Sequence, residues 1–562
     1  MRTTVYSALG ATVLAVLGSA PLLYFSPYVS TQEVSPATET ASAVGVSSVS
    51  VGVVSPVSAE AESLPAPRLT PAELDALIQR HLARRERMDA LVNNQPTGPP
   101  GLAETAGRQL QLAEQAETDF HIPPALSSLV IGRNSLNTRA RTVGVGSTLA
   151  EPTTVNEGIR VLYTGNTHAE FSTDGGVTFP AANNIPLPAG PATAPFVCCD
   201  FDTVYDQARG VTFWIALYLN AAGTQGSVRI FVRRQIQLAN NCSYTITPGA
   251  GIVPDFPKVE VGNNHLYLST NNVGPPPARL QVRRFNIDQM ADCQSTAVTT
   301  FTLAPAVGQR VVNPVDGIRN IAYFAYHENA TQIRIFSWPD TAAAPTSVLR
   351  GISAHNHANP DCRGGANNLD WLEGSTSFSI TGFRLRGAVG ASGRLGFWWN
   401  VSADAAAGHN QAHVHAAMFN TTGLTLVAQP HIFNSGFCFG YPAVAANERG
   451  DIGLSIAAGG RAGGGGLPVR GFVGIDDDFT PGIGVFGTVF QTCAGTHNPA
   501  NQRYGDYLSV SQHEPCDLAF TATCYAHNGG TGVAQVNARY VEFLRGRDNQ
   551  CYVGWRDETR IP

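Results

Sequence analysis

Short apolar runs that alternate with polar positions dominate the chain from about residue 128 onward. Examples are the segments 211–218, 320–326, 395–399 and 518–525. Each has the length and the β-branched or aromatic content of a strand. No convincing crossover helix separates one run from the next. The pattern therefore predicts an all-β protein of antiparallel sheets and argues against a parallel α/β sheet.

The strand-forming region contains seven similar strand starts. In each, a polar or aromatic residue, often near a proline, leads into a strand of small apolar residues. The starts are residues 151–155, 199–202, 255–259, 312–315, 368–371, 441–444 and 504–507. A repeat of roughly 50 to 80 residues predicts a β-propeller of four-stranded antiparallel blades. We expect seven blades, with six as the alternative, and strands near Leu129 and Tyr540 that close the ring.

The segment 171–179, Phe-Ser-Thr-Asp-Gly-Gly-Val-Thr-Phe, predicts a tight turn between two strands. Ser172 and Asp174 carry short polar side chains that fold back onto the N–H groups of such a turn. Gly175 and Gly176 supply the positive φ angles that it needs. We expect the ring of Phe179 to pack back between sheets, so that this turn fastens the fold.

The first 127 residues have a different pattern. An uncharged, largely apolar run to Phe25 follows Arg2 and predicts a signal peptide or membrane anchor over residues 1–25. Residues 26–69 are rich in Ser, Val, Ala, Thr and Pro and predict a disordered or extended low-complexity spacer. The predicted mature chain is therefore secreted, periplasmic or in the cell envelope, and it contacts a membrane only if the N-terminal segment stays uncleaved.

Residues 70–127 predict a helical segment before the propeller, which we place at 128–562. Thr70 and Glu73 have the spacing of a capping box, with a proline at the first helical position. A helix over about 71–92 then follows, with an apolar face that we expect to pack on the propeller. A weaker helical pattern covers roughly 101–117.

Composition supports this architecture and narrows the partners. The 562 residues include 57 Gly and 36 Pro, and only 14% are charged, which is typical of a turn-rich and strand-rich protein. The net charge is −6 and no basic stripe occurs, so nucleic acid is not an expected partner. Every basic residue except Lys258 is arginine.

Ten cysteines predict several disulfides in an oxidising compartment. No Cys-x-x-Cys spacing occurs, so zinc binding by cysteine ranks below disulfide formation. Their connectivity cannot be derived from the sequence. Cys516 and Cys524 could bridge two neighbouring strands, and we expect the adjacent Cys198 and Cys199 to have separate partners.

Residues 145 to 545 resemble the sialidase-superfamily (BNR-repeat) propellers of bacterial secreted proteins. The resemblance is carried by the Asp-box spacing in 171–179, by Cys198-Cys199-Asp200, by Tyr205-Asp206, by Tyr441-Pro442-Ala443-Val444 and by Arg503-Tyr504-Gly505-Asp506-Tyr507. It implies blades around a central tunnel, the Asp-box on the outer rim, and any ligand at the tunnel mouth, where the blade starts converge.

The chain departs from sialidases in the residues of their active site. That family holds a substrate carboxylate with three arginines, the first in an early Arg-Ile-Pro motif. Here Arg-Ile-Pro occurs only at 560–562, and the early propeller has Gly-Ile-Arg-Val at 158–161 instead. The resemblance therefore does not extend to the carboxylate-binding motif of sialidases, and the family's catalytic residues are not transferred.

The blade starts supply the candidate site residues. Glycoside hydrolysis needs two carboxyl groups, one of them kept protonated by its surroundings. The planar guanidinium of an arginine suits an anionic sugar. The predicted catalytic residues are Asp200, Asp255, Asp506 and Tyr507, and the predicted ligand-binding residues are Glu151, Asp202, Asp370, Tyr441, Arg503 and Tyr504. The alternative is that these residues cap strands and tie loops.

Histidines form a second candidate site. In a strand, His413 and His415 share one face, and together with Asp361 they could bind a metal. Nearby histidines are His409, His355 and His357. Hydrogen-bonded or surface histidines are the alternative interpretation. A structural Ca²⁺ at residues 476–478 is the remaining candidate cofactor, with a solvated turn as its alternative.

The sequence therefore predicts a secreted, sialidase-like propeller that engages glycans at its tunnel mouth, with exo-sialidase-like glycoside hydrolysis as its reaction if it is an enzyme. The first alternative is a non-catalytic carbohydrate- or protein-binding propeller, and the second is a uronate polysaccharide lyase or metal-dependent variant. An enzyme predicts a pocket with a raised carboxyl pKa. A binding module predicts a shallow mouth with Tyr441, Tyr504 or Tyr507 facing solvent. A lyase predicts a histidine that acts with Tyr504 or Tyr507.

Overall fold

The computed structural model describes residues of one compact unit, Val44–Pro562. The described residues are 48–58, 69–70, 72–74, 76–80, 111–113, 127–142, 146–234, 240–275, 279–303, 313–317, 319–356, 360–372, 384–480, 482–529 and 532–549. The predicted signal or anchor and the Arg-Ile-Pro at 560–562 lie outside them. Within the described ranges, no helix has the length and apolar character needed to cross a membrane.

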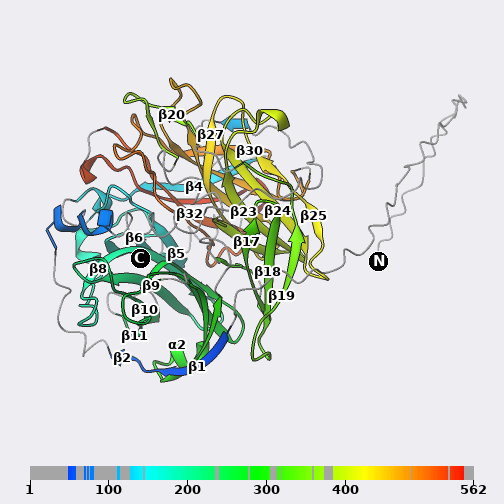
Figure 1. Cartoon of the computed structure of the whole chain (residues 1–562). Coiled ribbons are helices and arrows are strands. Elements are labelled where there is room, and N and C mark those ends of the chain that lie inside the picture. Colours follow the sequence, from blue (N-terminus) through cyan, green and yellow to red (C-terminus); the bar gives the residue numbers. More distant parts are fainter. Residues whose placement is uncertain are drawn as a thin grey trace, which may run out of the picture. The chain divides into compact units, whose positions relative to one another are not determined.

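Seven sheets follow one another along the chain and form a seven-bladed β-propeller (Figure 1). Blade 1 consists of β5 (Thr153–Glu157), β6 (Arg160–Gly165) and β7 (His168–Ser172), and blade 2 of β8 (Phe196–Asp206), β9 (Val211–Leu219), β10 (Gly226–Arg234) and β11 (Cys242–Ile246). Blade 3 consists of β12 (Val253–Val261), β13 (His265–Val273), β14 (Arg279–Asn286) and β15 (Thr296–Leu303). Blade 4 consists of β16 (Asn313–Pro314), β17 (Ile321–Asn329), β18 (Gln332–Pro339) and β19 (Thr346–Gly351). The predicted fold class is confirmed, although blade 1 has three strands rather than four.

The remaining blades follow the same plan. Blade 5 consists of β22 (Gly387–Ala391), β23 (Arg394–Val401), β24 (His413–Asn420) and β25 (Leu426–Ala428), with β26 (His431–Ile432) beside β24. Blade 6 consists of β27 (Cys438–Ala446), β28 (Ile452–Gly459), β29 (Arg470–Asp476) and β30 (Thr488–Cys493). Blade 7 consists of β31 (Val510–Gln512), β32 (Phe520–Cys524), β33 (Arg539–Arg545) and β4 (Leu129–Leu136). Short helical segments are α2 (Ile287–Ala291), η2 (Arg139–Arg141), η3 (Ala181–Asn183), η4 (Ala405–Ala407), η5 (Val533–Gln535) and η6 (Gly546–Asp548).

The ring closes as the sequence predicts. β4 comes before the first blade in the chain but pairs antiparallel with β33 as the outer strand of the seventh blade. The innermost strands of successive blades contact one another, and β31 of the last blade contacts β5 of the first. This closure leaves no gap between the first and last blades.

Two strands from the predicted spacer are ordered on the propeller. β1 (Ser48–Val54) pairs with β15 of blade 3, and β2 (Val57–Ser58) pairs with β11 of blade 2. Farther along, β3 (Gln111–Ala113) pairs parallel with β30, so the helix predicted over 101–117 is wrong at these residues. Extended backbone gains sheet hydrogen bonds at an outer blade edge, and this gain overrides a weak local helical pattern.

The predicted capping box is confirmed. Residues 72–74 and 76–80 are helical, and the Thr70 backbone N–H donates to Glu73 Oε2 at 2.8 Å. The Glu73 N–H in turn donates to Thr70 Oγ1 at 3.3 Å. Leu77 and Ile78 are buried in the apolar core that blade 2 shares with blade 3, so this helix packs on the propeller.

Six of the seven predicted blade starts lie at or just before an innermost strand, and one is wrong. Residues 369 and 370 form β21 (Leu369–Asp370), which pairs with β20 (Arg363–Gly364) in a separate two-stranded sheet. Blade 5 begins instead at β22, whose residues are Gly and Ala apart from one Val. A Cβ on Gly387 would come within 3.0 Å of the Val444 side chain, so the close approach of β22 to β27 requires a small residue there.

The turn at 171–179 has the hydrogen bonds that its residues predict. Ser172 Oγ accepts from the Gly176 N–H at 2.9 Å, and Asp174 Oδ1 accepts from the Thr178 N–H at 2.9 Å. Gly176 has φ +74° and lies against the Tyr540 ring. The Phe179 ring packs between Tyr163 of blade 1 and Tyr540 of blade 7. A strand precedes this turn, but only an isolated bridge pairs the chain that follows it.

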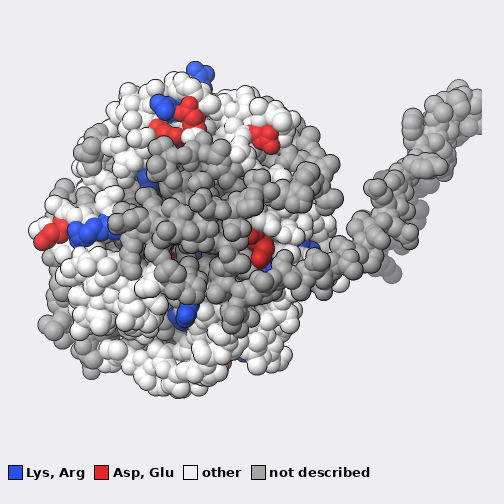
Figure 2. All heavy atoms as spheres, in the orientation of Figure 1, with Lys and Arg blue, Asp and Glu red and all other residues white. Residues whose placement is uncertain are grey.

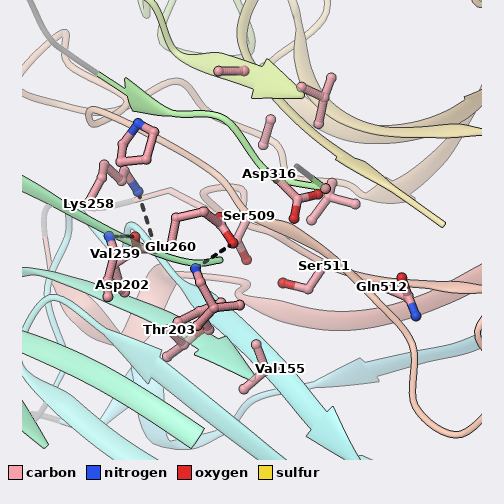
Figure 3. A pocket seen from close by; sticks show the side chains of 18 of the residues that line it. Val155, Asp202, Thr203, Lys258, Val259, Glu260, Asp316, Ser509, Ser511 and Gln512 are labelled. Carbon is pink, nitrogen blue, oxygen red and sulfur yellow. Dashed lines mark hydrogen bonds and ion pairs between the residues drawn. The ribbon is translucent and has the colours of Figure 1, made fainter. Parts of the chain in front are cut away.

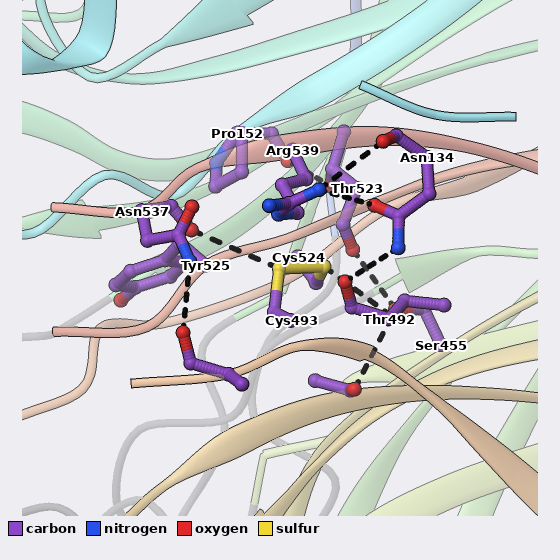
Figure 4. Close-up of a disulfide and its surroundings, with 12 residues drawn as sticks. Asn134, Pro152, Ser455, Thr492, Cys493, Thr523, Cys524, Tyr525, Asn537 and Arg539 are labelled. Atoms are coloured by element: carbon purple, nitrogen blue, oxygen red, sulfur yellow. Dashed lines mark hydrogen bonds between the residues drawn. A yellow bond between two sulfur atoms is a disulfide. The ribbon is translucent and has the colours of Figure 1, made fainter. Parts of the chain in front are cut away.

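Four disulfides join described cysteines, and both expectations about their partners are wrong. Cys198 and Cys199 are bonded to each other, and Cys524 pairs with Cys493 rather than with Cys516. Figure 4 shows that this second bridge ties β30 of blade 6 to β32 of blade 7. The other two bridges are Cys242–Cys293 and Cys362–Cys438. Cys516 is disulfide-bonded as well.

Charged groups are sparse on the described part of the face that Figure 2 shows. In the view of Figure 2, basic and acidic side chains lie as scattered small groups, and no basic stripe crosses the coloured part of that face.

The acidic residues of the predicted calcium segment, 476–478, have partners within the protein. Asp477 contacts Arg545 at 2.7 Å, Asp478 pairs with Arg547, and Asp476 accepts from the Gly484 N–H, so arginines and a backbone donor engage the predicted calcium segment.

Candidate functional site

The blade starts share an unusual backbone conformation. Glu151, Asp200, Phe256 and Tyr441 all have positive φ, between 39° and 58°, although none is glycine. In blades 2, 3 and 6 the strand pairing shifts register at this point. Such irregularities re-aim side chains, and left-handed non-glycine residues occur preferentially at functional sites. All four residues are buried.

A buried ionic network, which we call the axial hub, connects several of these starts. Asp506 Oδ1 lies 2.7 Å from Arg503 Nη2 and 3.2 Å from Arg384 Nη1. The Asp506 N–H donates to Glu151 Oε1 at 2.7 Å, and Arg386 donates to the Asp506 carbonyl. Residues of blades 1, 5 and 7 are therefore joined around one aspartate.

Tyr507 is the point at which the predicted carboxylates converge. Its hydroxyl donates to the Phe201 carbonyl at 2.9 Å. Burial raises its pKa well above the ordinary value, and four carboxylates raise it further. These carboxylates belong to Asp200, Glu151, Asp202 and Asp506. These five predicted residues therefore lie close enough to interact electrostatically.

The predicted aromatic ligand-binding residues are closed off from solvent. Tyr441 and Tyr504 are fully buried, and Tyr507 is 2% exposed. The Tyr504 hydroxyl donates to the Tyr525 carbonyl at 2.6 Å, and the two rings stack with centroids 4.2 Å apart. The guanidinium of Arg386 lies 4.7 Å from the centre of the Tyr441 ring. The shallow, aromatic-lined mouth that a binding module predicts is therefore absent at these three residues.

Two predicted site residues lie apart from the hub contacts described above. Asp255 is fully buried at the register shift of β12, where its main chain pairs with Asn271. Asp370 lies in the small β20–β21 sheet rather than at a blade start, because that start was misplaced. Its carboxylate accepts from the Leu372 N–H at 3.0 Å, and burial raises its pKa.

An axial cavity of about 150 Å³ is lined by residues of all seven innermost strands (Figure 3). Its charged lining residues are Asp202, Glu260, Asp316, Glu514, Lys258, Arg319 and Arg386. Arg386 belongs to both the cavity lining and the hub, so the two regions are in direct contact. Of the cavity carboxylates, the sequence predicted only Asp202.

Glu260 and Asp316 are two acidic residues in the lining of this cavity, from the neighbouring blades 3 and 4. Figure 3 shows both side chains at the pocket. Burial raises the pKa of Glu260 well above its ordinary value, and the Asp316 charge raises it further. Burial also raises the pKa of Asp316, but N–H donors from Ala446 and Gly317 and the charge of Arg319 oppose that rise. Burial and the Asp316 charge therefore disfavour the ionised form of Glu260, whereas the N–H donors and Arg319 favour that of Asp316, so Glu260 is the better proton donor of the two.

Lys258, the single lysine of the chain, links the cavity to Tyr507. Its ammonium lies 3.4 Å from Asp202 Oδ1 and 3.6 Å from the centre of the Tyr507 ring. Asp202 Oδ2 also accepts from the Val259 N–H at 3.0 Å. Burial raises the pKa of Asp202, whereas Lys258 and these hydrogen bonds lower it. The cation therefore holds this carboxylate in place beside the ring.

Glu514 is the fourth carboxyl group of the cavity. It accepts from Gln207 Nε2 at 2.8 Å. Burial, followed by the neighbouring Asp517 carboxylate, raises its pKa to about 9. At neutral pH this side chain is therefore a neutral carboxylic acid.

The residues that the sequence missed include Glu260, Asp316, Glu514, Arg384 and Arg386. Lys258 and Glu260 stand two residues apart in β12 and both line the cavity, so the alternation of charge within an innermost strand was an available signal. The two arginines precede β22, the blade start that the sequence misplaced. Asp316 follows the very short β16, and no local pattern marks it.

The structure groups His413 with two histidines other than its predicted partner His415. His413 lies with His409 and His431, and their ligand atoms are all within 4.8 Å of one another. His415 stacks its ring on His431, with centroids 4.2 Å apart. Asp361 contacts Arg363 at 2.6 Å and accepts from the Gly463 N–H. His357 lies outside the described residues.

Comparison with known proteins assigns neither a family nor an activity to this chain. No protein-family model matches the sequence, and neither does any curated protein. Matching solved structures include the polysaccharide lyase Uly1, at 8% identity and a TM-score of 0.36 over 75% of this chain and 99% of that one. Others are the NanB sialidase of Streptococcus pneumoniae, at 11% identity and 0.32 over 71% and 70%, and a lectin of Aleuria aurantia with a bound fucosyl-GlcNAc disaccharide, at 10% and 0.34 over 62% and 97%. Scores this low do not bear on activity, and the fold rests on the sheet topology.

Proposed function

We propose that this propeller is a glycoside hydrolase that binds one sugar residue in its axial cavity. The observation that carries the proposal is the pairing of Glu260 and Asp316 in a cavity at the centre of the blades. A protonated carboxyl group beside an ionised one is the arrangement that glycosidic bond cleavage requires.

The chemistry follows from the two pKa directions. Glu260 keeps its proton at neutral pH and donates it to the leaving oxygen as the general acid. Asp316 is the group that ionises, and it acts on the sugar carbon either directly or through a water molecule. Lys258 fixes Asp202 at the cavity wall, where it can accept a hydrogen bond from a sugar hydroxyl.

The size of the cavity restricts the substrate. A volume of about 150 Å³ accommodates a single six-membered ring, as a benzene-sized engineered cavity does. The proposed enzyme therefore removes terminal residues from a glycan instead of cleaving within a long chain.

The test is turnover of fluorogenic aryl glycosides, a sialoside included, and of mixed polysaccharides by the wild type, E260Q and D316N. The wild type should release product from at least one substrate. Each substitution should lower kcat at least about 100-fold, as the loss of a general acid or of its partner does. D292N is the matched control, because its carboxylate is 54% exposed in a surface ion pair with Arg234.

Two results would overturn the proposal. The first is turnover by E260Q or D316N at the wild-type rate. The second is no turnover of any substrate together with saturable glycan binding, which would favour the non-catalytic binding propeller. An aryl glycoside with a leaving group that needs no protonation sharpens the assignment, because E260Q should recover activity on it while D316N should not.

A further inference from the structure

Blade 5 gathers an unusual concentration of imidazoles. Among the described residues, His355, His409, His413, His415 and His431 line one small cavity of about 10 Å³. That volume is the size of a single water-sized sphere. All but His355 are buried by their surface exposure, and Trp399 and Phe433 pack against the imidazole rings. This site is separate from the axial cavity and from the proposed hydrolysis.

We propose that His409, His413 and His431 bind one divalent transition-metal ion, with Zn²⁺ as the ion that fits best. Their ligand atoms lie within 4.8 Å of one another, and His413 Nε2 is 3.1 Å from His431 Nδ1. Zn–N bonds of about 2.0–2.1 Å at tetrahedral angles place ligand nitrogens roughly 3.3 Å apart. Binding therefore requires His409 to move inward by no more than about 1.5 Å.

The strands and their connections fix each ligand in position. His413 begins β24, and His431 in β26 pairs across from His415 of that strand. His409 ends a tight loop, because its N–H donates to the Asp404 carbonyl at 2.8 Å and the Asp404 N–H donates to the His409 carbonyl. The site therefore needs no folding of a separate segment to form.

The orientation of His413 suits metal binding. Its Nδ1 lies 3.1 Å from the Gln411 carbonyl, which can only accept, so Nδ1 carries the hydrogen. The lone pair is then on Nε2, the atom that faces His431. A metal-bound histidine usually donates its other N–H to a carbonyl or carboxylate in this way.

The competing explanation is a hydrogen bond from His431 to His413 with no ion. It leaves His409 Nδ1 buried without a hydrogen-bond partner among the described residues, and both ring nitrogens of His415 are in the same situation. Buried polar atoms without partners are costly, and an ion bound by His409 removes part of that cost.

The site lies on the propeller face at which the innermost strands begin. Gly387 at the start of β22 pairs with Trp398, which pairs with Ala416 near the start of β24. Two strand spacings place β24 about 10 Å from β22.

A site made of imidazole ligands selects Zn²⁺, Cu²⁺ or Ni²⁺ over Ca²⁺ and Mg²⁺.

The full-length protein is stripped with a chelator, dialysed and mixed with ZnCl₂ or CoCl₂. We expect one Zn²⁺ retained per chain by elemental analysis, and Co²⁺ should give the intense visible absorption of a tetrahedral site. H409A and H413A should each weaken binding by more than about 100-fold, which exceeds the effect of losing an outer hydrogen-bond partner. H265A is the control, because His265 lies in blade 3 beside Asp340.

Retention of no metal by the wild type at micromolar Zn²⁺ would overturn the proposal and favour the hydrogen-bonded pair. Equal retention by the wild type, H409A and H413A would also overturn it, since the ion would then be adventitious. If H413A does not fold, the wild-type stoichiometry and H409A, whose residue lies in a loop, still decide the question.

Discussion

The axial hub and the axial cavity are built from the same residue types, but the hub residues precede innermost strands, the cavity is lined by these strands, and the carboxylates of the two regions have different partners. In the hub, Asp506 contacts two arginines directly, and Glu151 accepts from the Asp506 N–H. In the cavity, Glu260 faces another acid, Asp316, and burial raises the pKa of both. The difference teaches that the partner of a buried carboxylate, rather than its place at a blade start, separates a structural role from a chemical one.

The largest expected effect is loss of stability on removing the centre of the hub. D506A leaves Arg384 and Arg503 buried without their anion, and should lower the free energy of unfolding by about 3–5 kcal/mol. Chemical denaturation measures this change. D288A is the control, because Asp288 is 67% exposed in its pair with Arg209 and should cost less than about 1 kcal/mol. A D506A protein as stable as D288A would remove the structural role from the hub.

Unlike D506A, the E260Q substitution in the cavity should not destabilise the fold. Glutamine has the shape of protonated glutamate, and burial and the Asp316 charge raise the pKa of Glu260, so the folded state disfavours its charged form. The substitution should therefore leave the free energy of unfolding at pH 7 within about 1 kcal/mol of wild type or increase it, while turnover falls. A loss of stability comparable with that of D506A would place Glu260 in the structural class and break the comparison.

The pH dependence of stability tests the cavity at Glu514. An acid whose pKa is higher in the folded state than in the unfolded state makes the folded protein bind more protons, so stability falls as pH rises between the two values. For Glu514 this fall should begin near its unfolded pKa of 4.5 and continue to about 9. Denaturation of wild type and E514Q across this range should give a smaller slope in the variant. Parallel curves would contradict the raised pKa.

The smallest effect is expected where the two regions meet. K258M removes the ammonium that contacts Asp202 and the Tyr507 ring, and should cost about 1 kcal/mol of stability. K258R keeps the charge and should lose less. A larger loss for K258M than for D506A would show that the cavity, rather than the hub, holds the blades together.

Much of the fold was predictable because blades repeat. Strand alternation and the recurring starts locate six of the seven blades, and the turn at 171–179 follows from the hydrogen-bonding capacity of Ser172 and Asp174. The start of blade 5 was not predictable, because Gly387–Ala391 has neither a polar nor an aromatic leader. Its small residues reflect contact with β27, which is a tertiary requirement that no local pattern records.

The candidate site was predictable only in part, because convergence in space depends on the register of strands. The starts near Asp200 and Asp506 were found, but their role changed once the arginines beside Asp506 were known. Glu260 and Asp316 lie 56 residues apart, from 260 to 316, and come together only because β12 of blade 3 packs beside β16 of blade 4. His413 and His431 likewise come together through the pairing of β24 with β26.

The most direct test of the account is the position of a bound glycan. A crystal structure of E260Q soaked with a glycan that the wild type cleaves or binds should show one sugar ring in the axial cavity, between residue 260 and Asp316. A sugar bound on the outer surface of a blade, with the axial cavity empty, would contradict the assignment of the cavity as the functional site.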